Sequence, residues 1–449
     1  MDADNHTLST EHLSLGLNSR GLTFHSLEVK SRQQSSSQAT RDVLVGFEDQ
    51  EAYRERLFFG STVGRYANRL PAGKTALKSG AEISLNGPNS VCLHGGDSGF
   101  DTLPWTPLNR PDSSLFPLDD PLHPISPLPS DPHAPRLESE KLFRLFSPSG
   151  NDGFPCTLET EALVVVQEEE GEGDEGKLGK VKVVLRSKIK EDGDKDIEKG
   201  TPVNLTVHWG FRLDDCIDSD ILNHSLYIDS TELVSLDDKG VSTGSIDKLD
   251  QNGKGFDYHS KTDRKIGDGY PEGGIDRNFL LTPRKSKTPI SPKPQLVLTA
   301  PSSLPDNAAG PRLELSFKTS LPSVQIYSAP GLDGSGPTRK LAHQKQKKTL
   351  TTSTNSRNVD SEEKSEKKKG YEQNGALFIE FQQPVGTISH TCAVDAKPDN
   401  ELKGWLEKRF DEMELGKDSR EDEKSWEKDS LLKRGQVWES WVEVEIKEL

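Results

Sequence analysis

The sequence has few of the residues that mark disulfide-rich or zinc-binding proteins. Only four of its 449 residues are cysteines, and they stand far apart at Cys92, Cys156, Cys216 and Cys392 without a Cys-x-x-Cys pair. This spacing predicts neither a zinc site nor a dense disulfide framework. It is typical of a protein from a reducing compartment.

Long apolar runs are also missing. No stretch is long enough to span a bilayer, and residues 1–7 have neither the basic region nor the apolar core of a signal peptide. We therefore predict a soluble, cytoplasmic protein without a membrane partner.

Basic charge is in deficit, since the formal net charge is −16. Nucleic-acid binding needs basic surface against the phosphates, so this balance argues against a nucleic-acid partner. The one basic stretch, 339–369, lacks interleaved aromatics and reads as a solvated loop. Hydrophobic residues make up 31%, below the usual ~45–50%, a range that also counts glycine. We expect a real core diluted by polar insertions.

Short apolar stretches separated by turn signals dominate the rest of the chain. Such a pattern predicts an all-β fold, a sandwich or a barrel, and the lack of a fixed-period repeat disfavours a propeller. The expected strands are 13–30 (as a hairpin), 42–47, 83–85, 142–146, 158–166, 180–189, 203–211, 225–229, 295–300, 312–319, 323–328, 376–382 and 441–447.

Helical signals are confined to two places. The charged run 48–56 predicts a helical turn, and apolar residues near a 3.6-residue spacing predict a short helix within 400–415. Residues 1–12 are polar and are expected to be a flexible N-terminal segment, with 13–449 forming one β-sandwich domain. The expected polar insertions lie at about 104–137, 168–179, 283–294, 331–373 and 397–430.

Three of the expected strands place polar or aromatic side chains on the face opposite their apolar residues, because successive strand residues alternate faces. A sheet face of this composition suits a sugar, which needs hydrogen-bonding groups beside an aromatic surface. A lone strand His or Glu is more often simply hydrogen-bonded or solvated, and alternation alone does not show that these faces meet. The alternating sets are Asn204, Thr206 and His208, then Gln325 and Tyr327, then Phe378, Glu380 and Gln382.

The stretch 58–69 adds a second polar group. It begins with Phe58 and Phe59, contains glycines at 60 and 64, and ends in Asn68 and Arg69. An amide and a guanidinium fork suit a ligand rich in hydroxyls, whereas the simpler reading is a loop with a surface Arg–carboxylate pair. The glycine-rich run 331–336 has no following helix and is not a phosphate loop.

Seven blocks of residues occur in the order found in a known family: 42–47 with 59–69, 93–101 with Trp105, 147–155, 201–208, 274–279, 324–327 and 379–382. In these blocks the sequence resembles the aldose 1-epimerases, the galactose mutarotase family. The resemblance runs from about residue 13 to the C-terminus between the insertions. It implies a large β-sandwich (a galactose mutarotase-like supersandwich) that acts on an aldose sugar without metal or organic cofactor, as a monomer or weak homodimer.

The resemblance also implies roles for particular residues. Glu380 is the expected general base and His208 the expected general acid of a reaction that opens and recloses the sugar ring. A carboxylate is ionised at neutral pH, and the reference pKa of histidine, ~6.5, lies near the working pH. The residues expected to bind the sugar are Asn68, Arg69, His94, Asp276 and Gln325.

The chain departs from the family pattern at Val207, where many members have Asn, at Phe211-Arg212, and at Arg277, where His is common. These changes bear on substrate preference. Two alternatives stay open: an epimerase of phosphorylated hexoses, which would use the arginines at 65, 69, 212 and 277, and a sugar-binding protein without activity.

Overall fold

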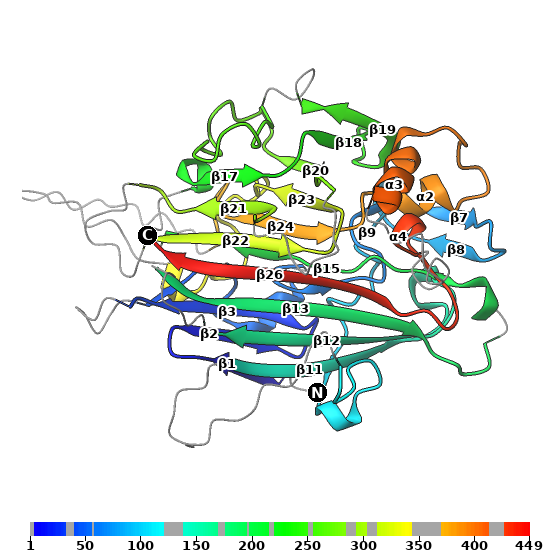
Figure 1. Cartoon of the computed structure of the whole chain (residues 1–449), viewed down its shortest axis with the longest axis horizontal. Helices are drawn as coiled ribbons and strands as arrows, with labels where there is room; N and C mark the ends of the chain where they lie inside the picture. Colours follow the sequence, from blue (N-terminus) through cyan, green and yellow to red (C-terminus); the bar gives the residue numbers. More distant parts are fainter. Residues whose placement is uncertain are drawn as a thin grey trace, which may run out of the picture.

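The structure is a computed structural model in which three sheets carry most of the chain (Figure 1). It describes residues 4–32, 40–55, 58–120, 138–168, 176–194, 197–214, 220–249, 255–283, 293–302, 312–343, 370–412 and 426–449. Within these ranges, no helix is both long and apolar enough to cross a membrane.

The largest sheet of the described residues has eight strands, and the long strand β26 runs through its middle (Figure 1). Every two adjacent strands of this sheet pair antiparallel. In spatial order the strands are β10 (Thr106–Leu108), β11 (Glu138–Ser147), β12 (Leu158–Gln167), β13 (Lys177–Ile189), β26 (Trp438–Glu448), β22 (Leu313–Thr319), β21 (Leu296–Thr299) and β17 (Ser225–Ile228).

The second sheet has six strands and carries the polar faces expected from the sequence. Its spatial order is β16 (Trp209–Phe211), β24 (Leu377–Gln382), β23 (Ser323–Tyr327), β20 (Asp276–Leu280), β18 (Glu232–Leu236) and β19 (Ser242–Lys248). A third sheet orders β1 (Asn5–Ser9), β2 (Leu13–Asn18), β3 (Thr23–Lys30) and β4 (Thr40–Asp42).

Short paired strands and helices complete the described chain. The pairs are β5 (Thr62–Val63) with β15 (Thr206–Val207), β6 (Arg69–Pro71) with β9 (Val91–Leu93), β7 (Gly73–Ala76) with β8 (Glu82–Leu85), and β14 (Thr201–Pro202) with β25 (Leu431–Leu432). The α-helices α2 (Thr387–Thr391), α3 (Glu401–Glu412) and α4 (Trp426–Asp429) gather at one end of the sheets, beside β7 and β8 (Figure 1). The 3-10 helices are η1 (Gln50–Arg54), η2 (Pro88–Ser90), η3 (Arg110–Asp112), η4 (Asn151–Gly153), η5 (Ile197–Lys199), η6 (Ile221–Asn223) and η7 (Leu341–His343).

One hydrophobic core joins the three sheets. The ring centroids of Phe317 on β22 and Phe381 on β24 lie 5.8 Å apart, and those of Phe24 on β3 and Trp209 on β16 lie 5.4 Å apart. Each such buried side chain contributes roughly 1.5–3 kcal/mol of transfer free energy. The predicted all-β sandwich is confirmed, and the apolar faces of 203–209, 323–327 and 376–382 all point into this core.

Most local expectations hold. The hairpin at 13–30 is β2 with β3, the helical turn at 48–56 is η1, and the helix within 400–415 is α3. Strands β12 and β13 pair across the Glu/Gly-rich run, of which residues 169–175 lie outside the described part. Parts of the other predicted insertions, 121–137, 284–292, 344–369 and 413–425, lie outside it as well.

The prediction of a flexible N-terminal segment is wrong for residues 5–9. They form β1, which pairs with β2 from Asn5 opposite Asn18 to Ser9 opposite Ser14. The strand is polar, and its apolar residue Leu8 is buried in the core. Pairing with the adjacent strand β2 and burial of Leu8 order this segment, and its polar composition does not reveal either contact.

The described flanks of two predicted insertions are also more buried than expected. Leu115 and Phe116, within 104–137, are buried with β11 and β12 residues. Lys340, within 331–373, forms a buried ion pair with Asp42, and His343 Nδ1 lies 2.7 Å from Tyr371 Oη. The described ends of the predicted insertion 331–373 are therefore attached to the fold by buried polar contacts.

Candidate active site

A cavity of about 550 Å³ opens beside the six-stranded sheet. Its apolar lining is mainly aromatic, with Phe58, Phe59, Tyr327 and Phe378 contributing. The structure brings all seven residues predicted for the site to this one cavity: Asn68, Arg69, His94, His208, Asp276, Gln325 and Glu380. Strands from widely separated parts of the sequence thus supply one polar wall.

His208 and Glu380 face each other at the cavity. Nε2 of His208 lies 3.2 Å from Oε1 of Glu380, and both side chains are almost fully buried. The predicted strand 203–211 is interrupted at His208, whose main-chain N–H donates to Ser61 O at 2.8 Å while its carbonyl accepts from Gly60 N at 2.9 Å. The loop that precedes Asn68 and Arg69 therefore fixes the backbone of His208.

Burial changes the protonation expected from the sequence. It raises the pKa of the Glu380 carboxyl to about 8, helped by the charge of Asp276 and opposed by Arg69. It lowers the pKa of the His208 imidazole to about 4. The ordinary pKa values assumed from the sequence are therefore wrong for both groups, because their charged forms lose water. Two groups this close titrate together, and near neutral pH the pair holds one proton in total.

His94 presents a fixed proton to the same space. The main-chain N–H of Asn68 donates to the ring atom Nδ1 of His94 at 3.1 Å. The main-chain N–H of His94 donates in turn to the main-chain carbonyl of Asn68 at 3.0 Å. Burial, together with His208 and Arg69, lowers the pKa of His94 well below its usual value, so its ring is neutral. Because Nδ1 accepts a hydrogen bond, the single ring proton is on Nε2, which is a donor.

This tautomer bears on metal binding. One ligand atom each from His94, His208 and Glu380 lies within 4.8 Å of the others, a spacing that would suit a metal ion. A metal ligand must offer an unprotonated nitrogen, however, and Nε2 of His94 carries the ring proton. The group is therefore better suited to sugar oxygens than to a metal.

Arg69, Asp276 and Gln325 form a second polar unit on the cavity wall. Arg69 Nη2 lies 3.2 Å from Asp276 Oδ2, and Gln325 Nε2 donates to Asp276 Oδ1 at 2.5 Å. Both carboxylate oxygens are thus held, yet each keeps a lone pair for a ligand hydroxyl. Asn68 Oδ1 accepts from the Arg69 N–H at 2.9 Å and orients this loop.

Three atoms at the cavity are buried without a hydrogen-bond partner among the described residues: Nδ1 of His208, Oε2 of Glu380 and Oε1 of Gln325. Buried polar atoms are normally paired, so three unpaired atoms on residues of one cavity indicate a candidate site for polar partners, either a ligand or bound water.

The remaining arginines considered from the sequence do not line the cavity. Arg65 is buried and donates to main-chain carbonyls, including Ser147 O and Cys156 O at 2.9 Å each. Arg212 is buried against Asp214 at 2.9 Å. Arg277 is exposed, with its guanidinium 5.5 Å from the Phe256 ring centre.

Four further cavity residues were not singled out from the sequence: Glu55, Leu93, Gly331 and Leu332. Glu55 caps the C-terminal end of η1, in the charged run 48–56, and charge alone does not predict that it lines a cavity. Gly331 and Leu332 begin the glycine-rich run 331–336, whose sequence gives no sign of a sugar site. No local pattern distinguishes them, since they reach the cavity only through tertiary contacts.

The fold and this cavity define a β-sandwich protein of the galactose mutarotase-like class. Solved structures share the fold: a GalM/aldose epimerase homologue from C. elegans superposes with a TM-score of 0.63 at 18% identity, covering 100% of this chain and 99% of that one. Galactose 1-epimerase from Lactobacillus acidophilus gives 0.61 at 16% identity, covering 100% and 95%.

Sequence relatives are consistent with this class. Galactose mutarotase from Bos taurus is 29% identical over 335 residues, which is 73% of this chain and 78% of the relative. Aldose 1-epimerase from Escherichia coli is 24% identical over 319 residues, 68% and 73% of the two chains. A model of the aldose 1-epimerase family matches residues 7–366. The chain belongs to the aldose 1-epimerase family, and it is accordingly an isomerase that interconverts sugar anomers.

Proposed function

We propose that the protein interconverts the α and β anomers of unphosphorylated aldohexoses such as glucose and galactose. The observation that carries this proposal is the buried His208–Glu380 pair, 3.2 Å apart in a cavity lined by hydrogen-bonding and aromatic side chains. Anomer exchange needs a base and an acid at the same anomeric centre, and this pair supplies both.

The single proton of the pair accounts for the chemistry. Burial favours the arrangement with the single proton on Glu380, and ring opening proceeds from the other arrangement, in which His208 holds it. Glu380 then takes the proton of the C1 hydroxyl while His208 gives its proton to the ring oxygen. The C1–O5 electron pair goes to the ring oxygen as C1 becomes a carbonyl. Rotation about C1–C2 exposes the other carbonyl face, and closure returns each proton to its origin. The pair holds one proton before and after each step, so no external proton is needed.

The neighbouring groups suit the sugar in both forms. Nε2–H of His94 and the guanidinium of Arg69 are donors that can steady the ring oxygen as its negative charge develops. Asp276, held by Arg69 and Gln325, accepts from a distal hydroxyl. Aromatic rings, with Phe378 5.0 Å from the His208 ring, cover the apolar face of the sugar.

The charges favour a neutral substrate over a phosphorylated one. Among the described lining residues, the acids are Glu55, Asp276 and Glu380, and the one arginine, Arg69, is already paired with Asp276. A phosphate group would meet net negative charge here, since Arg65, Arg212 and Arg277 lie elsewhere.

A polarimetric comparison tests the function. The optical rotation of pure α-anomers of glucose, galactose and glucose 6-phosphate is followed with and without the protein. We expect faster loss of rotation for the two neutral sugars and little acceleration for the phosphate ester. Equal acceleration of the phosphate ester would show that the charge argument fails. Sugar binding without acceleration would favour a binding protein on the same scaffold.

Asp276→Ala separates binding from chemistry. We expect KM for galactose to rise about 10-fold or more, because a hydrogen bond to a charged group is worth about 1.5–3 kcal/mol. kcat should fall less, since Asp276 does not touch the reacting atoms. Initial rates over a range of sugar concentrations measure both. A fall in kcat alone would place Asp276 in the chemical step.

A further inference from the structure

A second group of polar side chains lies on the same face of the β strands as His208 and Glu380 and is buried beyond them. Gln382 follows Glu380 by two residues on β24 and therefore points to the same side. Thr206 precedes His208 by two residues on β15, which contacts β24. Asn278 on β20 is on the same face but two strands from Glu380, because it lies opposite Gln325, which itself lies opposite Glu380.

These side chains are completely enclosed. Gln382 and Asn278 are both 0% exposed, and Thr206 is 2% exposed. Neither Nε2 nor Oε1 of Gln382 has a hydrogen-bond partner among the described residues, and the same is true of Thr206 Oγ1 and Asn278 Nδ2. Oε2 of Glu380, at the border with the sugar cavity, is in the same condition.

Several unpaired polar atoms on neighbouring strand positions require a common explanation, because buried amides and hydroxyls are costly unless they are hydrogen-bonded. The Cα atoms of residues two apart on a strand are separated by about 6.5 Å, and side chains as long as Gln and Glu can share one bridging water across that spacing. The set offers both donors and acceptors, and a buried water needs two to four such partners.

We propose that Gln382, with Thr206, holds bridging water against Oε2 of Glu380, and that Gln382 is a positioning residue for the general base. This inference rests on the proposed function for the base role of Glu380, but not for the existence of the water site. The hydrogen-bonded water fixes the rotation of the carboxyl group, so that Oε1 stays directed at His208 and the sugar.

The same contact adjusts the charge of Glu380. The titratable and charged groups that line the cavity with this carboxyl are His208, His94, Asp276, Arg69, Glu55 and Tyr327. Burial and Asp276 favour its neutral form, and Arg69 opposes them. A water that donates to Oε2 favours the ionised form, which is the form that accepts a proton. Loss of Gln382 should therefore shift the carboxyl further towards its neutral form.

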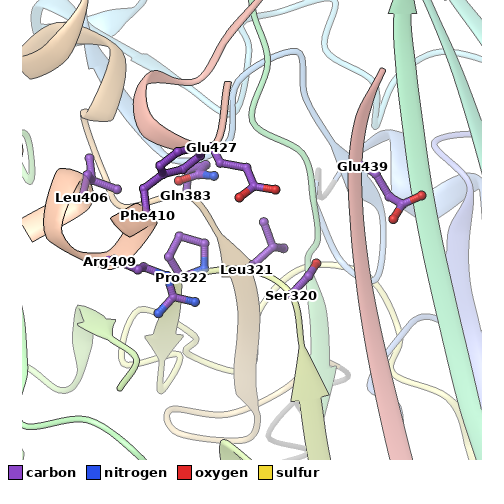
Figure 2. A pocket seen from close by; sticks show the side chains of 9 residues that line it. All are labelled: Ser320, Leu321, Pro322, Gln383, Leu406, Arg409, Phe410, Glu427 and Glu439. Atoms are coloured by element: carbon purple, nitrogen blue, oxygen red, sulfur yellow. The ribbon is translucent and has the colours of Figure 1, made fainter. Parts of the chain in front are cut away.

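Gln383, the residue after Gln382, provides a matched control for the Gln382→Met variant. Gln383, which directly follows β24, is also buried, but it lines a different, small cavity of about 40 Å³ with Leu406 and Phe410 of α3 (Figure 2). Its Oε1 also has no hydrogen-bond partner among the described residues. Gln383→Met therefore removes an equally buried amide without touching the face of Glu380.

The experiment compares Gln382→Met, Gln383→Met and the unchanged chain by polarimetry with galactose. For Gln382→Met we expect kcat to fall about 10-fold with KM within about 2-fold, and the alkaline limb of the pH profile to move up by about one pH unit. Gln383→Met should leave the limb in place. Thr206→Val, a variant of nearly the same shape, should shift the limb in the same direction by a smaller amount. Equal behaviour of the two glutamine variants, or a fall in kcat without a shift of the limb, would overturn the positioning role.

A measurement without sugar separates this inference from the proposed function. A carboxyl whose pKa is raised by folding contributes stability that is lost as pH rises through its folded value, here about 8 for Glu380. The free energy of unfolding is measured in urea between pH 5 and 10. Its decline with rising pH should extend about one pH unit higher in Gln382→Met and be absent in Glu380→Gln. That shift in a protein without anomer exchange would support the water site and refute the proposed function. An unshifted decline in an active protein would refute the water site.

Discussion

Glu380→Gln and His208→Asn are each expected to lower kcat/KM for anomer exchange by about 10²–10⁴-fold, the usual contribution of a general acid or base. The amide of Gln cannot take the C1 proton, and the amide of Asn cannot deliver one to the ring oxygen. Because both groups act in the same step, the double variant should be scarcely slower than either single one.

The measurement is the rate of optical rotation change of α-galactose above the spontaneous rate. Glu314→Gln on β22 and His259→Asn are suitable controls, since both lie outside the cavity and change the same chemical groups. Circular dichroism and urea unfolding establish that each variant is folded. Near-normal exchange by folded Glu380→Gln or His208→Asn would refute the assignment of the pair.

The pH dependence of kcat/KM is the second large expected effect. Below the acid limb, near the His208 pKa of about 4, the pair takes a second proton and no base remains. Above the alkaline limb, near the Glu380 pKa of about 8, the pair loses its proton and no acid remains. Outside the two limbs the rate should fall about tenfold per pH unit. Attraction between the charged forms of the pair moves the limbs outward.

The profile is measured with the spontaneous rate subtracted at each pH, because mutarotation in water is itself catalysed by acid and base. Glu380→Gln provides the control, since its residual activity should lack the alkaline limb near pH 8. A limb near the reference pKa of histidine, ~6.5, would show instead that His208 titrates as though exposed.

Strand faces and helices whose apolar residues recur at a regular spacing were predictable from the sequence. The alternation within 323–327 and 376–382 placed the core side and the polar side correctly, because the two-residue period of a strand is a property of its own backbone. The helix α3 followed from the spacing of Leu402, Trp405 and Leu406 in the same way. The family resemblance named seven residues that meet at one cavity, but their roles stay predictions until the variants are measured.

Long-range contacts decided what the sequence did not show. Strand β1 is mostly polar, and besides its pairing with β2 it contacts β11 and β12, where the ring centroids of His6 and Phe143 lie 5.2 Å apart. The buried ion pair of Asp42 with Lys340 joins residues 298 positions apart, so no window of sequence contains it.

Composition and alternation determined an all-β fold and the polar side of each strand, and the resemblance in seven ordered blocks indicated the aldose 1-epimerase family. Only the tertiary structure decided that burial raises the pKa of Glu380 and lowers that of His208, and that enclosed amides lie behind them. Residue identity is local, whereas the removal of water from a charged group depends on every element packed around it.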